Sequence, residues 1–319
     1  MQDISVLVTG GAGFIGSHLV DHLLKSNMKV TVLDNLSTGS TANIVAFKNE
    51  MNFTFIEGDI RNIDTCLKAA KGQDYILHQA ALGSVPRSIK DPITSNEVNV
   101  SGFLNILQAA RECNVKRIVY AASSSTYGDS KKLPKVEENI GKPLSPYAVT
   151  KYVNELYADV FAKTYGMELI GLRYFNVFGP RQNPQGPYAA VIPLFIQAAL
   201  ENKAPVIHGD GLQTRDFTFV NNVVQANFKA MLTKNKEAIN QVYNVACGDR
   251  TTLLDTWNSI SEITETESQP EYTASRTGDV RDSMADTSKA HKLLNYTPTI
   301  KLHEGLKMTI DWFRQNIGL

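Results

Sequence analysis

Two spacings of apolar residues, one typical of strands and one typical of helices, alternate along the first half of the chain. Apolar runs rich in β-branched residues predict strands at about 4–9, 29–34, 53–57, 75–79, 117–122 and 169–174. Between most of these runs the apolar residues recur every three or four positions, which predicts helices near 15–26, 63–70, 95–113 and 146–165. Strands that alternate with helices in this way indicate a parallel sheet with helices on both faces.

The pattern changes beyond residue 176. Proline, glycine and asparagine are frequent in residues 176–187, and the strands predicted after this segment are short. Helices are expected near 191–201, 221–233, 252–264, 286–294 and 303–316. We therefore expect an α/β fold, with a doubly wound parallel sheet in 1–176, a smaller C-terminal α/β lobe in 177–319, and part of 215–247 returning to the first domain.

Composition narrows the class of protein. The 319 residues carry 32 basic and 32 acidic side chains, a balance that gives no support for a nucleic-acid or membrane partner. No apolar run reaches about 18 residues and the first strand begins at once, so we expect a soluble, cytoplasmic protein. The three cysteines are far apart and the six histidines show no metal-ligand spacing, so neither a disulfide framework nor a metal site is expected.

A glycine-rich turn connects the first strand to the first helix. Gly10, Gly13 and Gly16 follow the strand directly, and a helical pattern begins near Ile15. Such glycines permit a tight turn and bring backbone N–H groups close to a pyrophosphate, which the helix N-terminus also attracts. The turn predicts a Rossmann-type dinucleotide site. Asp34 ends the second strand, and its carboxylate suits a ribose 2′-hydroxyl and repels a 2′-phosphate, which favours NAD over NADP.

Small and polar residues follow three of the predicted strands. They occupy positions 59–60, 79–81 and 123–125. The carboxyl ends of parallel strands share one edge of a sheet, and ligands of doubly wound sheets bind along that edge. We therefore expect these residues to border the cofactor and its substrate.

A tyrosine and a lysine share one face of the helix that follows the fifth strand. Ser145 and Pro146 form a helix-start signal, and this start places Tyr147 and Lys151 one turn apart. Lowering a tyrosine pKa from about 10 to about 7 requires roughly 4 kcal/mol. A lysine ammonium and a positively charged nicotinamide would supply it. Tyr147 would then act as a general base toward a sugar hydroxyl, with a serine at the end of the fifth strand sharing the hydrogen bond.

Five motifs carry a family resemblance. In chain order they are TGGAGFIGSH, HQAA, SSSTYG, SPYAVTK and RYFNVFGP. With these motifs essentially the whole chain resembles the extended short-chain dehydrogenase/reductase family, which acts on nucleotide sugars. The resemblance implies that 1–176 bind NAD tightly and that 177–319 bind the nucleotide sugar. The cofactor-binding residues that we expect are Gly10, Gly13, Phe14, Ile15, Gly16, Asp34, Asn35, Ser37, Thr38, Asp59, Ile60, Gln79, Ala80, Ala81, Asn99, Tyr147, Lys151 and Tyr174.

The motif at the end of the fifth strand separates the reactions of this family. Dehydratases and decarboxylases that this chain resembles carry carboxylates there, as in TDEVYG or TSEVYG, whereas SSSTYG carries none. Oxidation and re-reduction at the sugar 4-position is the simplest chemistry that remains, which resembles a nucleotide-sugar 4-epimerase working through a bound 4-keto sugar. Counting back from Tyr127 places the catalytic hydroxyl at Ser123, and Ser124 remains a candidate beside Tyr147 and Lys151.

Similarity to the epimerases also implies how the substrate is held. Asn176, Arg215, Arg276 and Asp279 would anchor the nucleotide, with the arginines suited to phosphate oxygens. Ser283 stands where glucose-specific relatives carry a bulky tyrosine, which leaves room for an N-acetyl group. UDP-N-acetylglucosamine and UDP-N-acetylgalactosamine are therefore the expected substrates, with UDP-glucose and UDP-galactose left open. The expected substrate-binding residues are Gly83, Ser84, Ser123, Ser124, Asn176, Val191, Arg215, Arg276, Asp279 and Ser283.

Other interpretations stay open. A UDP-glucuronate 4-epimerase would share the hydroxyl, tyrosine and lysine, and it needs a cation for the sugar carboxylate, which Arg87 could supply. The chain could also be a non-catalytic NAD-binding regulator. In relatives, the helices that match 95–113 and 150–165 pair across a two-fold axis, so the resemblance implies a homodimer.

Overall fold

Parallel strands form the central sheet. The computed structural model describes residues 4–185, 189–274 and 281–316 of the chain. Within these residues the sheet has seven strands in the order β11-β6-β5-β4-β1-β2-β3, and all neighbours run parallel. The strands are β1 (Ser5–Thr9), β2 (Lys29–Asp34), β3 (Phe53–Glu57), β4 (Tyr75–His78), β5 (Arg117–Ser123), β6 (Glu168–Tyr174) and β11 (Gln241–Val245).

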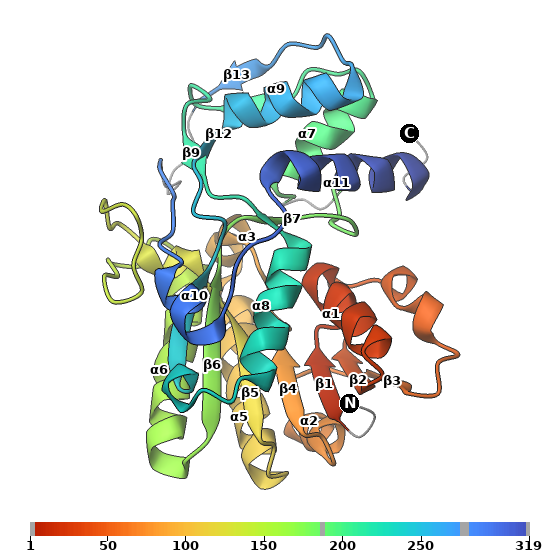
Figure 1. Ribbon diagram of the computed structural model, residues 1–319, viewed down its shortest axis with the longest axis vertical. Coiled ribbons are helices and arrows are strands. Elements are labelled where there is room, and N and C mark those ends of the chain that lie inside the picture. Colours follow the sequence, from red (N-terminus) through yellow and green to blue (C-terminus); the bar gives the residue numbers. More distant parts are fainter. Residues whose placement is uncertain (1–3, 186–188, 275–280, 317–319) are drawn as a thin grey trace.

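The doubly wound fold expected from the sequence is confirmed. The first six strands of this sheet match the predicted apolar runs to within one residue at each end. The strand order reverses between β1 and β4, which is where doubly wound sheets bind their ligands. The last strand, β11, pairs with β6 and so returns from the second half of the chain to the sheet (Figure 1). The domain boundary near residue 176 stays a prediction.

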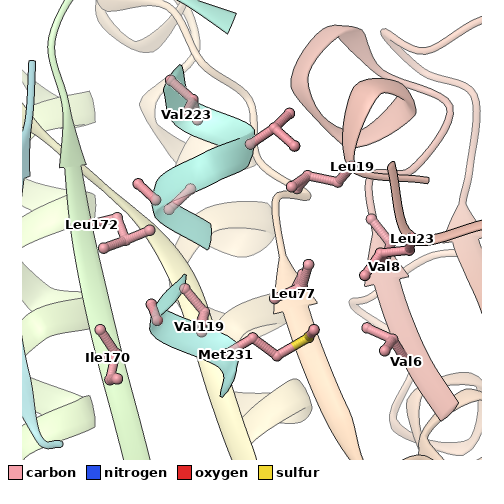
Figure 2. Packing of buried hydrophobic residues seen from close by; sticks show 14 of the residues in the cluster. Val6, Val8, Leu19, Leu23, Leu77, Val119, Ile170, Leu172, Val223 and Met231 are labelled. Carbon is pink, nitrogen blue, oxygen red and sulfur yellow. The ribbon is translucent and has the colours of Figure 1, made fainter. Parts of the chain in front are cut away.

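Three helices cover one face of the sheet: α1 (Phe14–Lys25), α8 (Val220–Leu232) and α10 (Ser288–Leu294). Because side chains alternate along a strand, Val6 and Val8 of β1 point to this face. Leu19 and Leu23, one turn apart on α1, pack in the same apolar cluster, and Met231 of α8 extends it (Figure 2). Burying each of these side chains contributes roughly 1.5–3 kcal/mol to folding.

The opposite face is covered by α2 (Ile63–Ala70), α5 (Gly102–Glu112) and α6 (Pro146–Tyr165). Leu7 of β1 and Ile118 of β5 point to this side, between the residues that face α1 and α8. Phe103 and Phe161 come from the covering helices and pack in the same cluster. Both faces are therefore apolar, as expected for strands buried on two sides.

The helix expected at 95–113 is interrupted. It begins earlier, as α4 (Pro92–Asn96), because Asp91 accepts a backbone N–H of that helix at 3.1 Å. A π-helical segment, Glu97–Ser101, then precedes α5. Apolar spacing does not show such a segment, and π-helical turns occur frequently at functional sites. The sequence pattern also missed α3 (Val85–Lys90), which is too short to display a helical period.

The second half of the chain also forms a smaller lobe beyond the carboxyl ends of the strands, at the top of Figure 1. Its core includes Phe195 and Trp257, whose rings meet edge to face with centroids 5.8 Å apart. Its elements are α7 (Val191–Leu200), α9 (Leu253–Thr264), α11 (Leu302–Asn316), and the strand pairs β7 (Val177–Phe178) with β10 (Thr218–Phe219), β8 (Val206–His208) with β13 (Glu271–Thr273), and β9 (Thr214–Arg215) with β12 (Thr251–Thr252). In the described ranges no helix combines the length and apolarity needed to cross a membrane.

Candidate active site

A cavity of about 630 Å³ runs along the carboxyl ends of the sheet strands. Its volume is in the range of small-molecule and cofactor pockets. The glycine turn, the ends of β2, β4 and β5, and the first turns of α6 all contribute to its wall. Of the residues expected from the sequence, it brings together Gly10, Gly13, Phe14, Ile15, Gly16, Asp34, Asn35, Ser37, Thr38, Asp59, Ile60, Gln79, Ala80, Ala81, Gly83, Ser84, Ser123, Ser124, Tyr147, Lys151, Tyr174 and Asn176.

Gly10 and Gly16 of the glycine turn lie directly against backbone atoms, which leaves no space for side chains there. Gly10 has a φ of 69°, and a Cβ there would lie 2.7 Å from the backbone nitrogen of Ala80. A Cβ on Gly16 would lie 2.1 Å from the Gly10 carbonyl oxygen, so α1 lies directly on the turn. Gly13 is the N-cap of α1 and brings no side chain to its first N–H groups. These groups can therefore bind a pyrophosphate.

Gly16→Ala tests this packing. The added methyl meets backbone, which cannot rotate away, so we expect the variant to lose its bound NAD and at least about 1–3 kcal/mol of stability. Gly83→Ala is the matched control for stability, because a Cβ on Gly83 meets no protein atom within 4 Å. Nucleotide released on heating and the unfolding free energy measure the two effects. Wild-type values for Gly16→Ala would contradict the role given to the turn.

Asp34 ends β2 and is held by two backbone donors. Its Oδ2 accepts the N–H of Ala12 at 2.9 Å, and its Oδ1 accepts the N–H of Leu36 at 2.8 Å. Each oxygen keeps a second lone pair for a further donor, such as a ribose hydroxyl. The carboxylate is fixed against the glycine turn and lines the cavity, so the residues present fit NAD.

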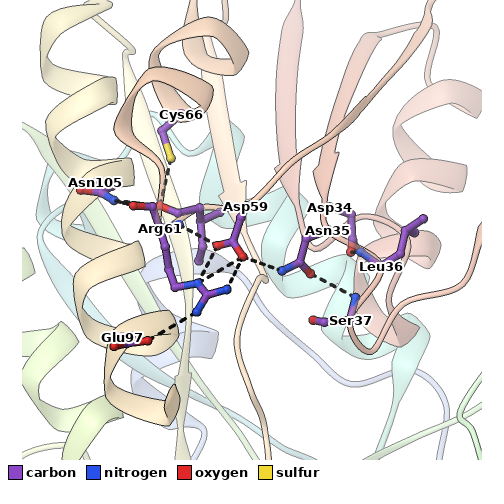
Figure 3. Close-up of polar contacts among 10 residues, drawn as sticks. Asp34, Asn35, Leu36, Ser37, Asp59, Arg61, Cys66, Glu97 and Asn105 are labelled. Carbon is purple, nitrogen blue, oxygen red and sulfur yellow. Dashed lines mark hydrogen bonds and ion pairs between the residues drawn. The ribbon is translucent and has the colours of Figure 1, made fainter. Parts of the chain in front are cut away.

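Asp59 anchors a polar network at the β2–β3 end of the cavity (Figure 3). Arg61 donates to Asp59 Oδ2 at 2.8 Å, and Asn35 Nδ2 donates to the same oxygen at 2.9 Å. The Arg61 hydrogen bonds lower the pKa of Asp59 to about 2. Asp59 is therefore a permanent carboxylate acceptor in this part of the cavity.

Lys151 is buried and lies one turn after Tyr147 on α6. Its Nζ donates to the carbonyl oxygen of Ala121 in β5 at 2.8 Å. Burial lowers the pKa of Lys151 to about 8, and the carboxylate of Glu155, one turn further along α6, works in the opposite direction. A lysine ammonium is thus directed to the strand end that carries the serines.

Tyr147 interacts with Ser123, the last residue of β5. Burial raises the pKa of Tyr147, and the hydrogen bond with the Ser123 side chain partly offsets that rise. This direction is opposite to the one expected from the sequence, because desolvation of the phenol outweighs the protein groups around it. A lowered pKa would need the positive nicotinamide charge, the second source that we expected. Ser123 Oγ also accepts hydrogen bonds from the N–H and the hydroxyl of Ser125, at 3.1 and 2.8 Å.

Two carboxylates line the cavity within the described part of the chain. They belong to Asp34 and Asp59, at the ends of β2 and β3. Tyr147 of α6 bonds to Ser123 at the end of β5, and β4 and β1 separate that strand from β2. The side chains of Ser123, Tyr147 and Lys151 therefore meet at the β5 end of the cavity, away from both carboxylates.

A second cavity, of about 260 Å³, adjoins the first. Asn176 borders both, and Val191 and Arg215 line the second. Arg215 Nη1 donates to the carbonyl oxygen of Thr214 at 2.9 Å, which holds the guanidinium in place. Ser283 is partly buried and lines neither cavity. The predicted anchors Arg276 and Asp279 lie outside the described residues.

Asn99 shapes the wall of the larger cavity from behind. It was expected among the cofactor contacts, yet it is not one of the described residues that line the cavity. Its Oδ1 accepts the N–H of Leu82 at 2.8 Å, and its Nδ2 donates to the Leu82 carbonyl at 3.2 Å and to Thr150 Oγ1 at 3.1 Å. Leu82 lines the cavity, so Asn99 fixes that backbone to α6.

Sequence reasoning missed several residues that border the two cavities. Some of them carried a signal. Val177 and Phe178 lie within the RYFNVFGP motif, Gln182 follows it by two positions, and Ala121 and Ala122 lie in the predicted fifth strand. Others lie in loops and short elements without a recognisable pattern, and they include Val85, Pro86, His208, Gln213 and Phe217.

Comparison with known proteins identifies the family. Residues 6–246 match the NAD dependent epimerase/dehydratase family. The chain belongs to this family. A UDP-N-acetylglucosamine 4-epimerase of Methanobrevibacter ruminantium, solved in complex with UDP-N-acetylmuramic acid, is 40% identical over 99% of both chains, with a TM-score of 0.94.

Two further relatives resemble the chain over nearly its whole length. A UDP-glucuronic acid 4-epimerase of Bacillus cereus, solved with UDP-glucuronic acid and NAD, is 34% identical over 98% of this chain and 99% of that one, with a TM-score of 0.91. A UDP-glucose 4-epimerase of Mycolicibacterium smegmatis is 37% identical over 97% and 98% of the two chains. The resemblance drawn from the motifs and the prediction of NAD as cofactor are confirmed. The relatives act on three different sugars, and the roles of single residues stay predictions.

Proposed function

We propose that this enzyme inverts the 4-hydroxyl of a UDP-hexose through a bound 4-keto intermediate, with UDP-N-acetylglucosamine and UDP-N-acetylgalactosamine as its preferred pair. One observation carries the proposal. Ser123, Tyr147 and Lys151 meet in the larger cavity, apart from the two carboxylates that line it in the described residues. Hydroxyl, phenol and ammonium groups suit proton exchange with an alcohol, whereas elimination or decarboxylation in relatives uses carboxylates at this strand end.

The residues of the glycine turn, Asp34 and the strand ends of β3 and β4 would hold NAD, which supplies hydride acceptance and return when bound. Tyr147 takes the proton of the sugar 4-hydroxyl as carbon 4 becomes a ketone, and Ser123 shares its hydrogen bond. Lys151 keeps positive charge near the phenol. The keto sugar then turns its other face, and Tyr147 returns the proton to the oxygen.

The diphosphate and base must stay fixed while the sugar turns. Asn176 lies where the two cavities adjoin, and Arg215 lines the second cavity. A guanidinium suits phosphate oxygens through paired donors. We therefore assign the nucleotide to the second cavity and the sugar to the larger one, beside Gly83, Ser84 and Tyr147.

An isotope label tests the bound intermediate. UDP-N-acetylglucosamine that carries deuterium at carbon 4 is expected to give the galacto epimer with the deuterium still at carbon 4, because the hydrogen leaves and returns within one complex. Mass spectrometry and proton NMR of the product follow the label. Loss of deuterium to water during turnover would contradict the bound 4-keto intermediate.

Ser283→Tyr tests the preference for the acetylated sugar. Ser283 lines neither cavity, so its role rests on the family resemblance, and the longer side chain of a tyrosine is expected to extend into the space proposed for the N-acetyl group. We expect kcat/KM for UDP-N-acetylglucosamine to fall roughly 10- to 200-fold relative to UDP-glucose. Ser283→Ala is the control, since it keeps the position small. Equal changes on both sugars would show that Ser283 does not set the choice.

The alternative of a UDP-glucuronate 4-epimerase gains no specific support. Arg87, the cation considered for the sugar carboxylate, is not among the described residues that line either cavity. It lies on α3, two residues beyond Val85, which does line the larger cavity. The alternative of a non-catalytic regulator is disfavoured by membership in a family of enzymes.

We also propose that the enzyme forms a homodimer through α6. Val149, Leu156 and Val160 share one face of this helix, and they are 47%, 50% and 53% exposed in the single chain. A two-fold axis would pair this face with itself. Sedimentation equilibrium should give twice the chain mass for the wild type and the single-chain mass for Leu156→Lys. A monomeric wild type, or a dimer that Leu156→Lys leaves intact, would contradict this interface. Cytoplasmic location stays a prediction.

A further inference from the structure

The first turn of α6 leaves one backbone donor without an acceptor in its own helix. Pro146 carries no N–H, and the N–H of Ala148 donates to Ser145 Oγ at 3.2 Å. The N–H of Val149 donates to the Ser145 carbonyl at 3.0 Å. The donor that remains belongs to Tyr147, because second-position N–H groups have no partner four residues earlier. The residue proposed as the acid–base group therefore depends on another element for its backbone hydrogen bond.

That acceptor is Ser88 on α3. Its Oγ accepts the N–H of Tyr147 at 3.0 Å and donates to the Val85 carbonyl at 2.8 Å. Ser88 is fully buried, so water does not compete for these bonds. Val85 and Ser84 line the larger cavity, where the proposed function places the sugar. One buried hydroxyl thus bridges the cavity wall and the backbone of Tyr147.

We propose that Ser88 is a positioning residue that fixes Tyr147 relative to the sugar-contacting wall at 84–86. The inference rests on the proposed function and assigns Ser88 no contact with substrate. Acid–base catalysis needs the two oxygens within hydrogen-bond reach, and a displacement of about 1 Å can cost 10²-fold in rate. Ser88 acts on that distance through the backbone of the tyrosine.

A second connection keeps the fold intact when Ser88 changes. Asn99 bonds both Leu82 and Thr150, and Thr150 Oγ1 donates to the Tyr147 carbonyl at 2.7 Å. The loop and α6 therefore remain joined without Ser88. Loss of its hydroxyl should loosen the tyrosine rather than unfold the protein.

The test compares buried serines on neighbouring helices. In Ser88→Ala we expect kcat to fall about 10- to 100-fold, with KM for the UDP-sugar and NAD content near wild type. Ser95→Ala is the matched control. Ser95 is 1% exposed and donates to the Asp91 carbonyl at 2.8 Å within its own helix region, so its loss should leave kcat unchanged. Ser88→Thr keeps the hydroxyl and should restore much of kcat.

Ser88→Cys separates packing from hydrogen bonding. Sulfur fills the site of the hydroxyl but accepts hydrogen bonds weakly, so kcat should fall as in Ser88→Ala while the unfolding free energy stays near wild type. Wild-type kcat in Ser88→Cys, or equal losses in Ser88→Ala and Ser95→Ala, would overturn the positioning role. A wild-type enzyme inactive on every UDP-sugar would instead remove the proposed function, which keeps the two failures distinct.

Discussion

Tyr147→Phe is expected to lower kcat by about 10²- to 10⁴-fold, the range that a positioned acid–base group contributes. The change removes the only oxygen that the proposed mechanism uses to exchange a proton with the sugar. It keeps the ring, and the backbone bond to Ser88 does not involve the phenol oxygen. We therefore expect NAD content, KM and the unfolding free energy to stay near wild type.

Tyr157→Phe provides the control for this substitution. Tyr157 lies on the same helix and packs, partly buried, against the apolar cluster beneath α5 and α6. Tyr157 lines neither cavity, so loss of its hydroxyl should leave kcat within about twofold of wild type. Turnover by Tyr147→Phe at a rate similar to that of Tyr157→Phe would contradict the acid–base role.

Arg173→Met is expected to lower the unfolding free energy by about 3–5 kcal/mol, the loss seen when one partner of a buried ion pair is removed. Arg173 of β6 donates to both oxygens of Glu155, at 2.9 and 2.7 Å, and to the Glu137 carbonyl at 2.9 Å. The two charged side chains are 4% and 7% exposed. Removing the guanidinium leaves the Glu155 carboxylate buried without its counter-charge.

A second substitution distinguishes this cause from lost packing. Adding Glu155→Gln to Arg173→Met removes the buried charge and should recover much of the loss. Urea unfolding of the wild type, both single variants and the double variant measures the recovery. A loss that the double variant does not recover would contradict the charge explanation.

The sequence was sufficient to predict the main elements because their signals are local. The β-branched runs of the sheet fall in the observed strands, and Ser145 with Pro146 marks the start of α6. The glycine turn and Asp34 likewise predicted one end of the larger cavity. These features depend on neighbours in the chain, so a pattern of residues records them.

Other features depend on contacts between distant segments. Ser88 and Tyr147 are 59 positions apart, and nothing near either residue indicates that they bond. The raised pKa of Tyr147 follows from burial, which the sequence does not show. The π-helical segment that carries Asn99 keeps the apolar spacing of an ordinary helix. Tertiary packing decides all three, which is why motifs alone predicted the chemistry better than its positioning.

The most direct test of the proposed activity incubates the purified enzyme separately with UDP-N-acetylglucosamine, UDP-glucose and UDP-glucuronate, without added NAD. Proton NMR and mass spectrometry then identify the products. We expect the acetylated sugar to convert fastest to its galacto epimer, with no loss of mass. Reaction of only the plain sugar or the glucuronate would contradict the pocket proposed at Ser283. Loss of water or carbon dioxide, or no reaction with any sugar even after NAD is added, would contradict 4-epimerisation itself.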